Sequence, residues 1–438
     1  MTDRTLRLGA ARVDITPAGP QWLDGYGNRT APSDGVYLPI AARALLLASG
    51  QERALLVSTE VLAFDAGQAR RVKAAIARTT SIPEEAIILA ATHTHCAPRV
   101  CDLVMPGAVD PVYRNWFEDR LVDAACRAAT AAQSIQVRIG RTEWDLGINR
   151  RLWTPSGTVM QPNPAGVIDR EVTTFWFEGA DGRVHASLTI HACHPTSRGG
   201  SRIGGDYPGV LMATLERDLG GIHLFALGCA GDVRPAFIGP HGGFRTAEIA
   251  EVFARGEALA ERVRATRAAA IPVAGPSVRA HREWVDLPLA TPPGLAELKE
   301  IAAQDASPLR RLWASRMLAE LTRGPLPTSV PFEIQAVSLG DVCPLVCYAG
   351  EMVVDYALSL NARHPGAVPV AYCNGSVGYV PSRRIYPEGG YEVDGSYPYY
   401  AQPAPFRLEV EERIAAATDR LLARLATAGQ GGGGEPCV

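Results

Sequence analysis

The 438-residue sequence contains no apolar run that approaches the roughly 18 residues of a membrane-spanning helix. Its formal net charge is only -3, and because the charges are interspersed it also lacks a basic patch for nucleic acid. Residues 1–7 lack the apolar core of a signal peptide. We therefore expect a cytoplasmic protein with a small-molecule substrate, no nucleic-acid partner and no stable membrane insertion. The sequence leaves open whether the chain forms a homo-oligomer.

Cysteine is present, but not in the pattern of a structural zinc site. The nine cysteines include no Cys-x-x-Cys pair, which argues against zinc held by thiolates. An odd number of cysteines in a reducing compartment indicates free thiols rather than disulfides. Cys96, Cys193, Cys229 and Cys373 lie beside the segments discussed below, so a cysteine nucleophile stays a rival hypothesis to small buried residues at strand ends.

The most informative segment is Ala-Ala-Thr-His-Thr-His at 90–95, which ends an apolar run. In an extended strand, His93 and His95 would leave the strand end on the same face, about 6 to 7 Å apart. Neutral imidazole is the commonest protein ligand for zinc, and catalytic zinc usually has three protein ligands and an open position. The pair therefore predicts either two metal ligands, or one ligand and one acid-base group.

Polar residues follow four further apolar runs, at positions where open α/β sheets place their ligands. These segments begin at His191, Gly228, Ala349 and Cys373. The first of them contains both His191 and His194, and their spacing alone makes either a candidate ligand. Five strand ends in total thus carry residues suited to chemistry.

Alternating runs predict an α/β fold: a central, mostly mixed sheet with helices on both faces and long active-site loops at the strand ends. The expected strands are 42–48, 54–58, 86–91, 172–177, 184–190, 222–227, 278–287, 332–339 and 368–372. The expected helices are 66–78, 112–132, 209–219, 246–268, 295–321, 352–361 and 406–426. The expected long loops, rich in Pro, Gly, Asn and Asp, are 151–168, 195–207, 237–244 and 381–405.

Short blocks spread over most of the chain have a specific order and spacing. They are residues 12–17, 25–27, 92–95, 149–150, 194–197, 231–233, 350–351, 379 and 391–392. Together they resemble the catalytic domain of the neutral/alkaline ceramidase family of zinc amidases. The resemblance implies one catalytic domain over 1–428, without the C-terminal immunoglobulin-like domain of larger members, and a flexible Gly-rich tail over 429–438.

The resemblance also implies a site for one zinc ion per chain. Its ligands would be His93, His194, Glu351 and Tyr379, and further catalytic residues would be His95, Arg150 and Tyr391. Two imidazoles, a carboxylate and a phenol are reasonable zinc ligands, and the metal would lower the pKa of a bound water towards 7 to give a hydroxide nucleophile. The remaining His, Arg and Tyr suit charge stabilisation and proton transfer in amide hydrolysis.

Each residue taken singly has a simpler interpretation. Glu351 is compatible with an ordinary first-turn glutamate of the following helix. Tyr379 and Tyr391 lie in a tyrosine-rich segment, where packing is the default role, and Arg150 precedes Arg151 as solvated arginine pairs do. The ordered match of the whole set, rather than any one residue, favours the metal site.

One position departs from the family pattern. Where ceramidases carry a serine implicated in catalysis after Gly-Asp-Val, this chain has Arg234. A guanidinium that points into the site would bind a carboxylate or another anionic group of the substrate, whereas one that points outward has no such role. With no signal peptide and no further domain expected, we predict a small soluble substrate, with an anionic group as one option, rather than a membrane lipid.

These observations predict a zinc-dependent amidohydrolase that uses metal-bound hydroxide on a linear amide. An esterase or lactonase with the same residues is the alternative within enzymes, because both reactions stabilise the same oxyanion. A catalytically silent metal-binding protein is the alternative from another class, because Arg234 replaces a residue tied to catalysis.

Overall fold

The computed structural model describes residues 5–275, 277–339 and 343–427. The Gly-rich tail expected at 429–438 lies outside these residues, and the division into one catalytic domain and a tail stays a prediction. In the described part of the chain, no helix has both the length and the apolar character needed to cross a membrane.

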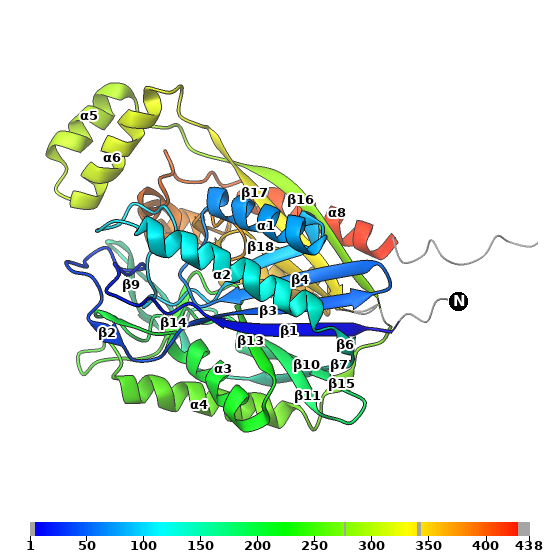
Figure 1. Ribbon diagram of the computed structural model, residues 1–438. Helices are drawn as coiled ribbons and strands as arrows, with labels where there is room; N and C mark the ends of the chain where they lie inside the picture. The colour runs from blue at the N-terminus through cyan, green and yellow to red at the C-terminus, as the bar shows by residue number, and fades with distance from the viewer. Residues whose placement is uncertain (1–4, 276, 340–342, 428–438) are drawn as a thin grey trace, which may run out of the picture.

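Two five-stranded sheets lie face to face at the centre of the molecule (Figure 1). The first, in the order β5-β4-β3-β1-β6, consists of β1 (Arg7–Asp14), β3 (Ala41–Ser49), β4 (Glu52–Thr59), β5 (Ile87–Ala91) and β6 (Gln133–Ser134). The second, in the order β13-β11-β10-β7-β15, consists of β7 (Gln136–Glu143), β10 (Glu171–Glu178), β11 (Val184–His191), β13 (Ile222–Leu227) and β15 (Ile271–Pro272). Each sheet combines antiparallel pairs with one parallel pair, β4 with β5 and β11 with β13.

Helices cover the outer faces of both sheets (Figure 1). The first sheet carries α1 (Ala66–Thr80) and α2 (Pro111–Thr130), and the second carries α3 (Asp206–Leu219) and α4 (Ile249–Thr266). Along β3, Leu45 and Leu47 pack between the sheets, whereas Ala44 and Leu46 pack towards the helices. Because strand side chains alternate, a strand buried on both faces has a continuous apolar sequence. The predicted α/β class with mixed sheets and helices on both faces is confirmed, and the strands form stacked sheets.

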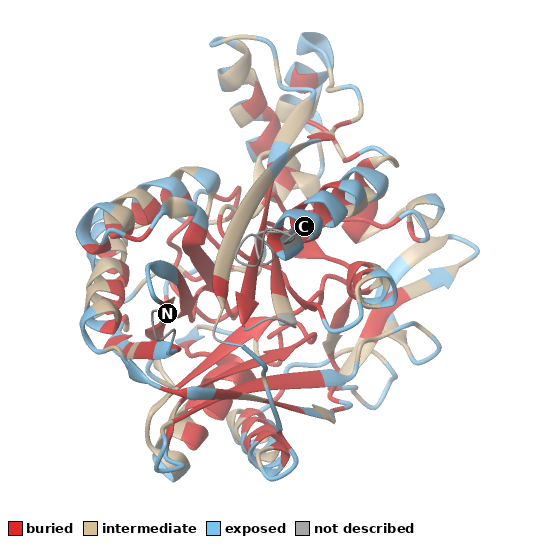
Figure 2. Ribbon diagram, turned by 90° about the vertical axis from the view of Figure 1, so that its right-hand side faces the viewer, coloured by how far each residue is buried: buried red, intermediate tan, exposed pale blue. Residues whose placement is uncertain are grey.

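A third sheet of four strands, in the order β16-β17-β18-β20, closes one side of the core. Its strands are β16 (Val278–Pro288), β17 (Ser329–Leu339), β18 (Cys343–Tyr348) and β20 (Val368–Val370), and α7 (Val354–Arg363) and α8 (Val410–Thr427) accompany it. Between β16 and β17 the chain forms a hairpin of α5 (Leu295–Gln304) and α6 (Pro308–Leu321), which projects from the body of the molecule (Figures 1 and 2).

Two predictions about local structure are wrong. The helix expected at 295–321 is divided, because Asp305 is extended, Ser307 caps a new helix through its side chain and Pro308 occupies the first helical turn. The loop expected at 151–168 is largely a hairpin of β8 (Gly147–Thr154) and β9 (Gly157–Asn163), with β14 (Val233–Pro235) on the other side of β8. The sequence of this hairpin shows no clear alternation of apolar and polar residues, because most of its side chains are only partly buried.

Several short elements lie in the connections between the longer ones. They are β2 (Gly35–Val36), β12 (Arg202–Ile203), β19 (Glu351–Met352), β21 (Tyr379–Val380), the 3₁₀ turns 84–86, 386–388 and 397–400, and a π-helical turn, Tyr391–Gly395. The expected loop at 381–405 is therefore built from three short helical turns.

Backbone hydrogen bonds tie the carboxyl ends of separate strands together. Ala91 N, at the end of β5, donates to Tyr372 O over 3.1 Å, and Ala371 N donates to Leu227 O, at the end of β13, over 2.8 Å. Gly228 N in turn donates to His191 O, at the end of β11, over 3.0 Å. The expectation that the strand-end segments meet in space is met, and the candidate site lies where they meet.

Candidate active site

Three buried histidines converge on one point. His93 and His95 follow β5, and His194 follows β11. Their Nε2 atoms form a triangle with sides of 2.9 Å between His93 and His194, 3.3 Å between His93 and His95, and 3.1 Å between His95 and His194. Among the described residues, these three form the one group of His, Cys, Asp or Glu side chains compact enough to hold a metal ion.

The convergence of the first two histidines does not come from an extended strand, as the sequence suggested. β5 ends at Ala91, and His93 adopts the left-handed backbone conformation with φ of 64°. This conformation is uncommon for a residue with a side chain and is typical of functional sites. It turns the His93 ring, whose centroid lies 5.0 Å from that of His95, back into the cluster.

The protonation of two of these rings is fixed by backbone carbonyls. Nδ1 of His93 lies 2.6 Å from Leu62 O, and Nδ1 of His194 lies 3.2 Å from Ala230 O. Because a carbonyl oxygen only accepts, each Nδ1 carries the proton and each Nε2 presents a lone pair. Two lone pairs that face each other cannot form a hydrogen bond, but they suit a cation placed beside them.

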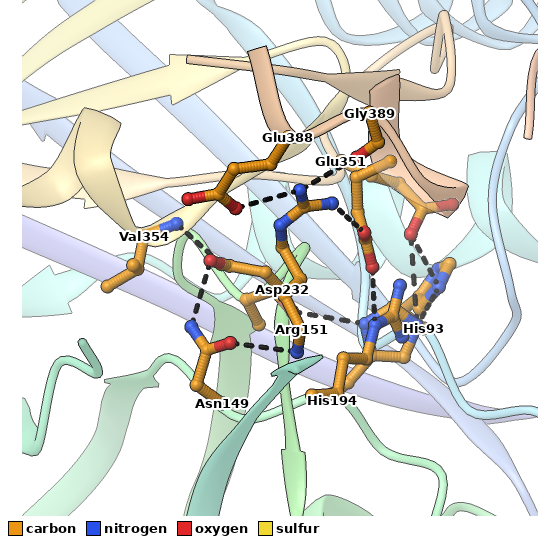
Figure 3. Close-up of polar contacts among 12 residues, drawn as sticks. His93, Asn149, Arg151, His194, Asp232, Glu351, Val354, Glu388 and Gly389 are labelled. Carbon is orange, nitrogen blue, oxygen red and sulfur yellow. Dashed lines mark hydrogen bonds and ion pairs between the residues drawn. The ribbon is translucent and has the colours of Figure 1, made fainter. Parts of the chain in front are cut away.

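Glu351 adds a negative charge to the cluster, as Figure 3 shows. Its Oε2 lies 3.3 Å from Nε2 of His93 and 3.8 Å from Nε2 of His194, and it is buried without a hydrogen-bond donor among the described residues. The other oxygen, Oε1, accepts a hydrogen bond from the Tyr400 hydroxyl. A buried carboxylate oxygen without a donor, next to two imidazole lone pairs, fits a divalent cation such as zinc.

Tyr379 borders the same cluster. It lies opposite Glu351 in the β19–β21 pair, and its ring is stacked parallel to that of His194 with centroids 6.3 Å apart. Tyr391 packs edge-on against Tyr379 at 5.3 Å between ring centroids. Burial raises the pKa of both phenols well above the usual range. The structure therefore brings both tyrosines to the site, where Tyr379 is buried and Tyr391 is half-buried.

Arg150 is held in place rather than solvated. Its Nε donates to Oε1 of Glu392 over 2.8 Å, and Nη1 of Arg151 donates to the other carboxylate oxygen over 2.6 Å. The guanidinium carbon of Arg150 lies 5.2 Å from the centroid of the Tyr379 ring. Nη2 of Arg150 is buried with no hydrogen-bond partner in the described residues, which leaves a charged donor free for a substrate oxygen.

His95 is buried next to a glycine that leaves room for it. At Gly25, where φ is 98°, an added Cβ would lie 2.4 Å from Nδ1 of His95. The ring of Tyr26 packs 5.0 Å from that of His95. Burial and the nearby His93 lower the pKa of His95 well below the usual value, which favours a neutral ring. The geometry is compatible with both roles that the sequence leaves open, a third imidazole ligand or an acid-base group.

Asp232 serves the fold rather than the chemistry (Figure 3). Its Oδ1 accepts from the backbone N of Val354, the first residue of α7, over 2.8 Å, and its Oδ2 accepts from Nδ2 of Asn149 over 3.1 Å. Burial raises the pKa of Asp232 to about 6. The Gly-Asp-Val block thus joins β14, β8 and α7 around the cluster.

Replacing Asp232 by alanine is expected to lower the free energy of unfolding by about 2 to 4 kcal/mol, since two buried donors lose their acceptor. Asp232→Asn keeps one acceptor and should lose less. Urea unfolding followed by circular dichroism measures both, with the exposed Glu300→Ala as the control. Equal midpoints for Asp232→Ala and the control would contradict the structural role.

The rival candidates from the sequence do not reach the cluster. His191 is buried elsewhere, with Nδ1 3.0 Å from Glu171 O, and burial lowers its pKa to about 4. Burial also raises the pKa of Cys96 to about 12, and those of Cys193, Cys229 and Cys373 well above the usual range. Because the thiolate is the nucleophile, such buried thiols do not favour the cysteine hypothesis.

Sequence reasoning gave no role to Glu392, Tyr400 or Tyr26, which hold Arg150, Glu351 and His95 respectively. Glu392 and Tyr26 belong to the blocks that resemble the ceramidase family, and this membership could have marked both residues as functional. Tyr400 is one of several tyrosines between 386 and 400, and nothing in its spacing marks it. Arg234, in β14, points into a cleft beside Tyr26 and does not face away from the site.

The molecule is an α/β protein of stacked mixed sheets, with a buried cluster of imidazoles and a carboxylate at the strand ends that could hold a metal ion. The model of the neutral/alkaline non-lysosomal ceramidase N-terminal domain matches residues 6–247, more than half of the chain, so the chain belongs to this family, whose members are amide hydrolases. The matched segment includes His93, His95, Arg150, His194 and Arg234, whereas Glu351, Tyr379 and Tyr391 follow it.

Solved structures show the same fold. The neutral ceramidase from Pseudomonas aeruginosa superposes with a TM-score of 0.73 at 18% identity, over 100% of this chain and 76% of that chain. A structure described as ceramidase complexed with C2 superposes with a TM-score of 0.71 at 19% identity, over 91% of this chain and 73% of that chain. No curated protein matches the sequence. The resemblance deduced from the sequence is thereby confirmed at the level of family and fold.

Proposed function

We propose that the chain is a zinc-dependent hydrolase that cleaves the carbon-nitrogen bond of a small soluble N-acyl compound. The observation that carries the proposal is the convergence of the Nε2 atoms of His93 and His194 on a carboxylate oxygen of Glu351 that has no hydrogen-bond donor in the described part of the chain. Membership of an amide hydrolase family supports the reaction type. The cytoplasmic location expected from the sequence belongs to the same proposal, and cell fractionation tests it.

His93, His194, Glu351 and Tyr379 would hold a single zinc ion, as the family resemblance implies. When bound there, zinc would supply Lewis-acid chemistry, which lowers the pKa of water and polarises a carbonyl group. The backbone carbonyls of Leu62 and Ala230 orient two of these ligands, a common arrangement for histidines at metal sites.

The remaining residues carry out the proton and charge steps. Hydrolysis adds a water oxygen to the acyl carbon, breaks the carbon-nitrogen bond and requires a proton on the departing nitrogen. His95, whose Nε2 faces the cluster, accepts a proton from water and returns it to that nitrogen. Arg150 donates from Nη2 to the carbonyl oxygen as negative charge develops there, and Tyr391 lines the same side.

Removing the metal is expected to abolish turnover reversibly. Elemental analysis of the purified protein should give about one zinc per chain, as four ligands around one ion require. Dialysis against a chelator should then lower the hydrolysis of an N-acyl amide to the background rate, and stoichiometric zinc should restore it. Protein without bound metal, and with activity unchanged by the chelator, would overturn the proposal.

Matched substrates distinguish the reaction types. An amide, an ester and a lactone with the same acyl group would place their carbonyl oxygen in the same oxyanion site. The comparison of their kcat/KM values therefore identifies the type of bond that the enzyme prefers. A preference for the ester or lactone, after correction for its higher intrinsic reactivity, would replace the amidase by an esterase or lactonase. Bound zinc without turnover of any acyl substrate would instead indicate a silent metal-binding protein.

A further inference from the structure

A cleft with a volume of about 520 Å³ opens beside the histidine cluster. Tyr26 lines it and also packs against the His95 ring, with centroids 5.0 Å apart, so the cleft lies next to the cluster. Three arginines line it, Arg29, Arg234 and Arg245, and no acidic side chain is present among the described residues of its wall. The cleft is therefore rich in positive charge.

Arg234 forms no salt bridge with an acidic side chain of the described residues, although Asp206 lies near enough to oppose the lowering of its pKa by burial. Its guanidinium carbon lies 4.3 Å from the centroid of the Phe244 ring, and its Nη2 donates to Thr196 O over 3.3 Å. Its Nε is buried and has no hydrogen-bond partner within the described ranges. Burial lowers the pKa of Arg234, and the nearby Arg150 lowers it further. Stacking fixes the plane of the guanidinium, and one edge of its fork keeps a free donor.

Arg29 repeats this arrangement on the wall of the same cleft. Its Nη2 donates to His95 O over 2.7 Å, its Nη1 donates to Gly200 O, and its guanidinium carbon lies 5.4 Å from the centroid of the Tyr26 ring. Its Nε is also buried without a partner in the part of the chain that the structure describes. Both arginines lie near an acidic residue without pairing with it. Burial lowers the pKa of each, and the charges of Asp24, near Arg29, and Asp206, near Arg234, oppose this shift. Neither guanidinium forms a salt bridge with a carboxylate among the described residues. A half-buried cation without a directly paired carboxylate suits an anionic ligand.

The other arginines near the site differ in this respect. Arg245 donates from both Nη atoms to Glu251, over 2.8 and 2.6 Å, and Arg150 donates to Glu392. Of these four arginines, only Arg29 and Arg234 thus lack a carboxylate at salt-bridge distance among the described residues. Both are placed next to the groups that would carry out hydrolysis.

We infer that this cleft binds a carboxylate of the substrate between Arg29 and Arg234. The inference rests on the proposed function for its catalytic consequence, and it names the substrate class: a small amide with a carboxylate a few bonds from the scissile bond. Planar guanidinium groups match a carboxylate through paired hydrogen bonds. The carboxylate belongs either to the amine part, as in an N-acyl amino acid, or to the acyl part, as in a monoamide of a dicarboxylic acid.

Binding of simple probes tests the cleft without turnover. We expect glutarate to bind the purified zinc-containing protein more tightly than glutaramide, its neutral diamide, in isothermal titration calorimetry. Arg234→Ser and Arg29→Ser should each weaken glutarate binding by about 10- to 100-fold, because each removes a charge-assisted hydrogen bond. Arg262→Ser, at an exposed position of α4 outside the cleft, is the matched control and should leave the affinity unchanged.

Equal affinity for glutarate in all variants would place the anion elsewhere, for example on the metal, and overturn the inference. Equal affinity for glutarate and glutaramide would do the same. If Arg234→Ser does not fold, Arg234→Lys, which keeps the charge and loses the planar fork, should still lower the affinity measurably.

Turnover then identifies the substrate class. With N-acetylglycine and N-acetylglycinamide as one pair, and glutaramic acid and glutaramide as the other, the carboxylate-bearing member of one pair should have the higher kcat/KM. Arg234→Ser should reduce that advantage mainly through KM. Carboxylate binding without hydrolysis of any amide would contradict the proposed function and leave the cleft assignment intact, so the two failures are distinguishable.

Discussion

Replacing His194 by alanine is expected to remove the bound zinc and to lower kcat/KM for the amide substrate by about 10³-fold or more. His194 presents its Nε2 lone pair 2.9 Å from that of His93, while Ala230 O holds its Nδ1 proton. Without this imidazole the ion loses a neutral nitrogen ligand that the folded chain orients in advance. Elemental analysis and steady-state kinetics on the same preparation measure both effects.

Two further variants make this result specific. His191→Ala removes another buried histidine of the same segment, three positions earlier, and should keep zinc and activity once the variant is shown to be folded. His95→Ala should keep most of the zinc while kcat falls. Loss of zinc from His95→Ala would make His95 a ligand, and zinc retained at full occupancy in His194→Ala would remove His194 from the ligand set.

His93 and His95 show which features of the site could be predicted from the sequence and which could not. The His-x-His motif drew attention to this strand end, the ordered match of all the blocks predicted a metal site there, and the assumed extended geometry was wrong. His93 instead has the left-handed conformation, with φ of 64°, and its Nε2 atom lies 3.3 Å from that of His95. Such a conformation is imposed by the tertiary contacts of His93, including its backbone hydrogen bond to Val61 O.

The resemblance and the following residues 195–197 favour His194 over His191, and the fold supplies a physical reason for that choice. Both follow β11 and both are buried, so neither spacing nor burial separates them. The structure separates them because the chain turns at Pro195, where His194 N donates to Val233 O over 3.0 Å and the ring points towards His93. A local pattern does not encode a contact with a residue about one hundred positions away.

Charged residues were the hardest to interpret from sequence. Arg150 and Arg151 look like a solvated pair, yet both are buried because Glu392 accepts from both. The partner lies in a π-helical turn, Tyr391–Gly395, inside a segment expected to be a loop. By contrast, the bounds of the strongly periodic strands and helices were predicted within a few residues. The spacing of their apolar residues shows which faces are buried.

The same ion pair leads to the second large effect. Arg150→Ala is expected to lower kcat by about 10²- to 10³-fold, the usual loss when a donor to the oxyanion is removed, with a smaller change in KM. Its Nη2 has no hydrogen-bond partner among the described residues, its guanidinium carbon lies 5.2 Å from the centroid of the Tyr379 ring, and its Nε donates to Glu392. The zinc content should not change, because no proposed ligand is removed.

Arg151→Ala is the matched control for this effect. Arg151 shares Glu392 with Arg150 and also binds Glu388 and Gly389 O, so its loss disturbs the same ion pair without removing a donor to the substrate. If kcat falls by a similar factor in Arg150→Ala and Arg151→Ala, the two arginines act by positioning Glu392. A large loss for Arg150→Ala alone, with zinc retained, would be the result expected of a group that stabilises the developing charge.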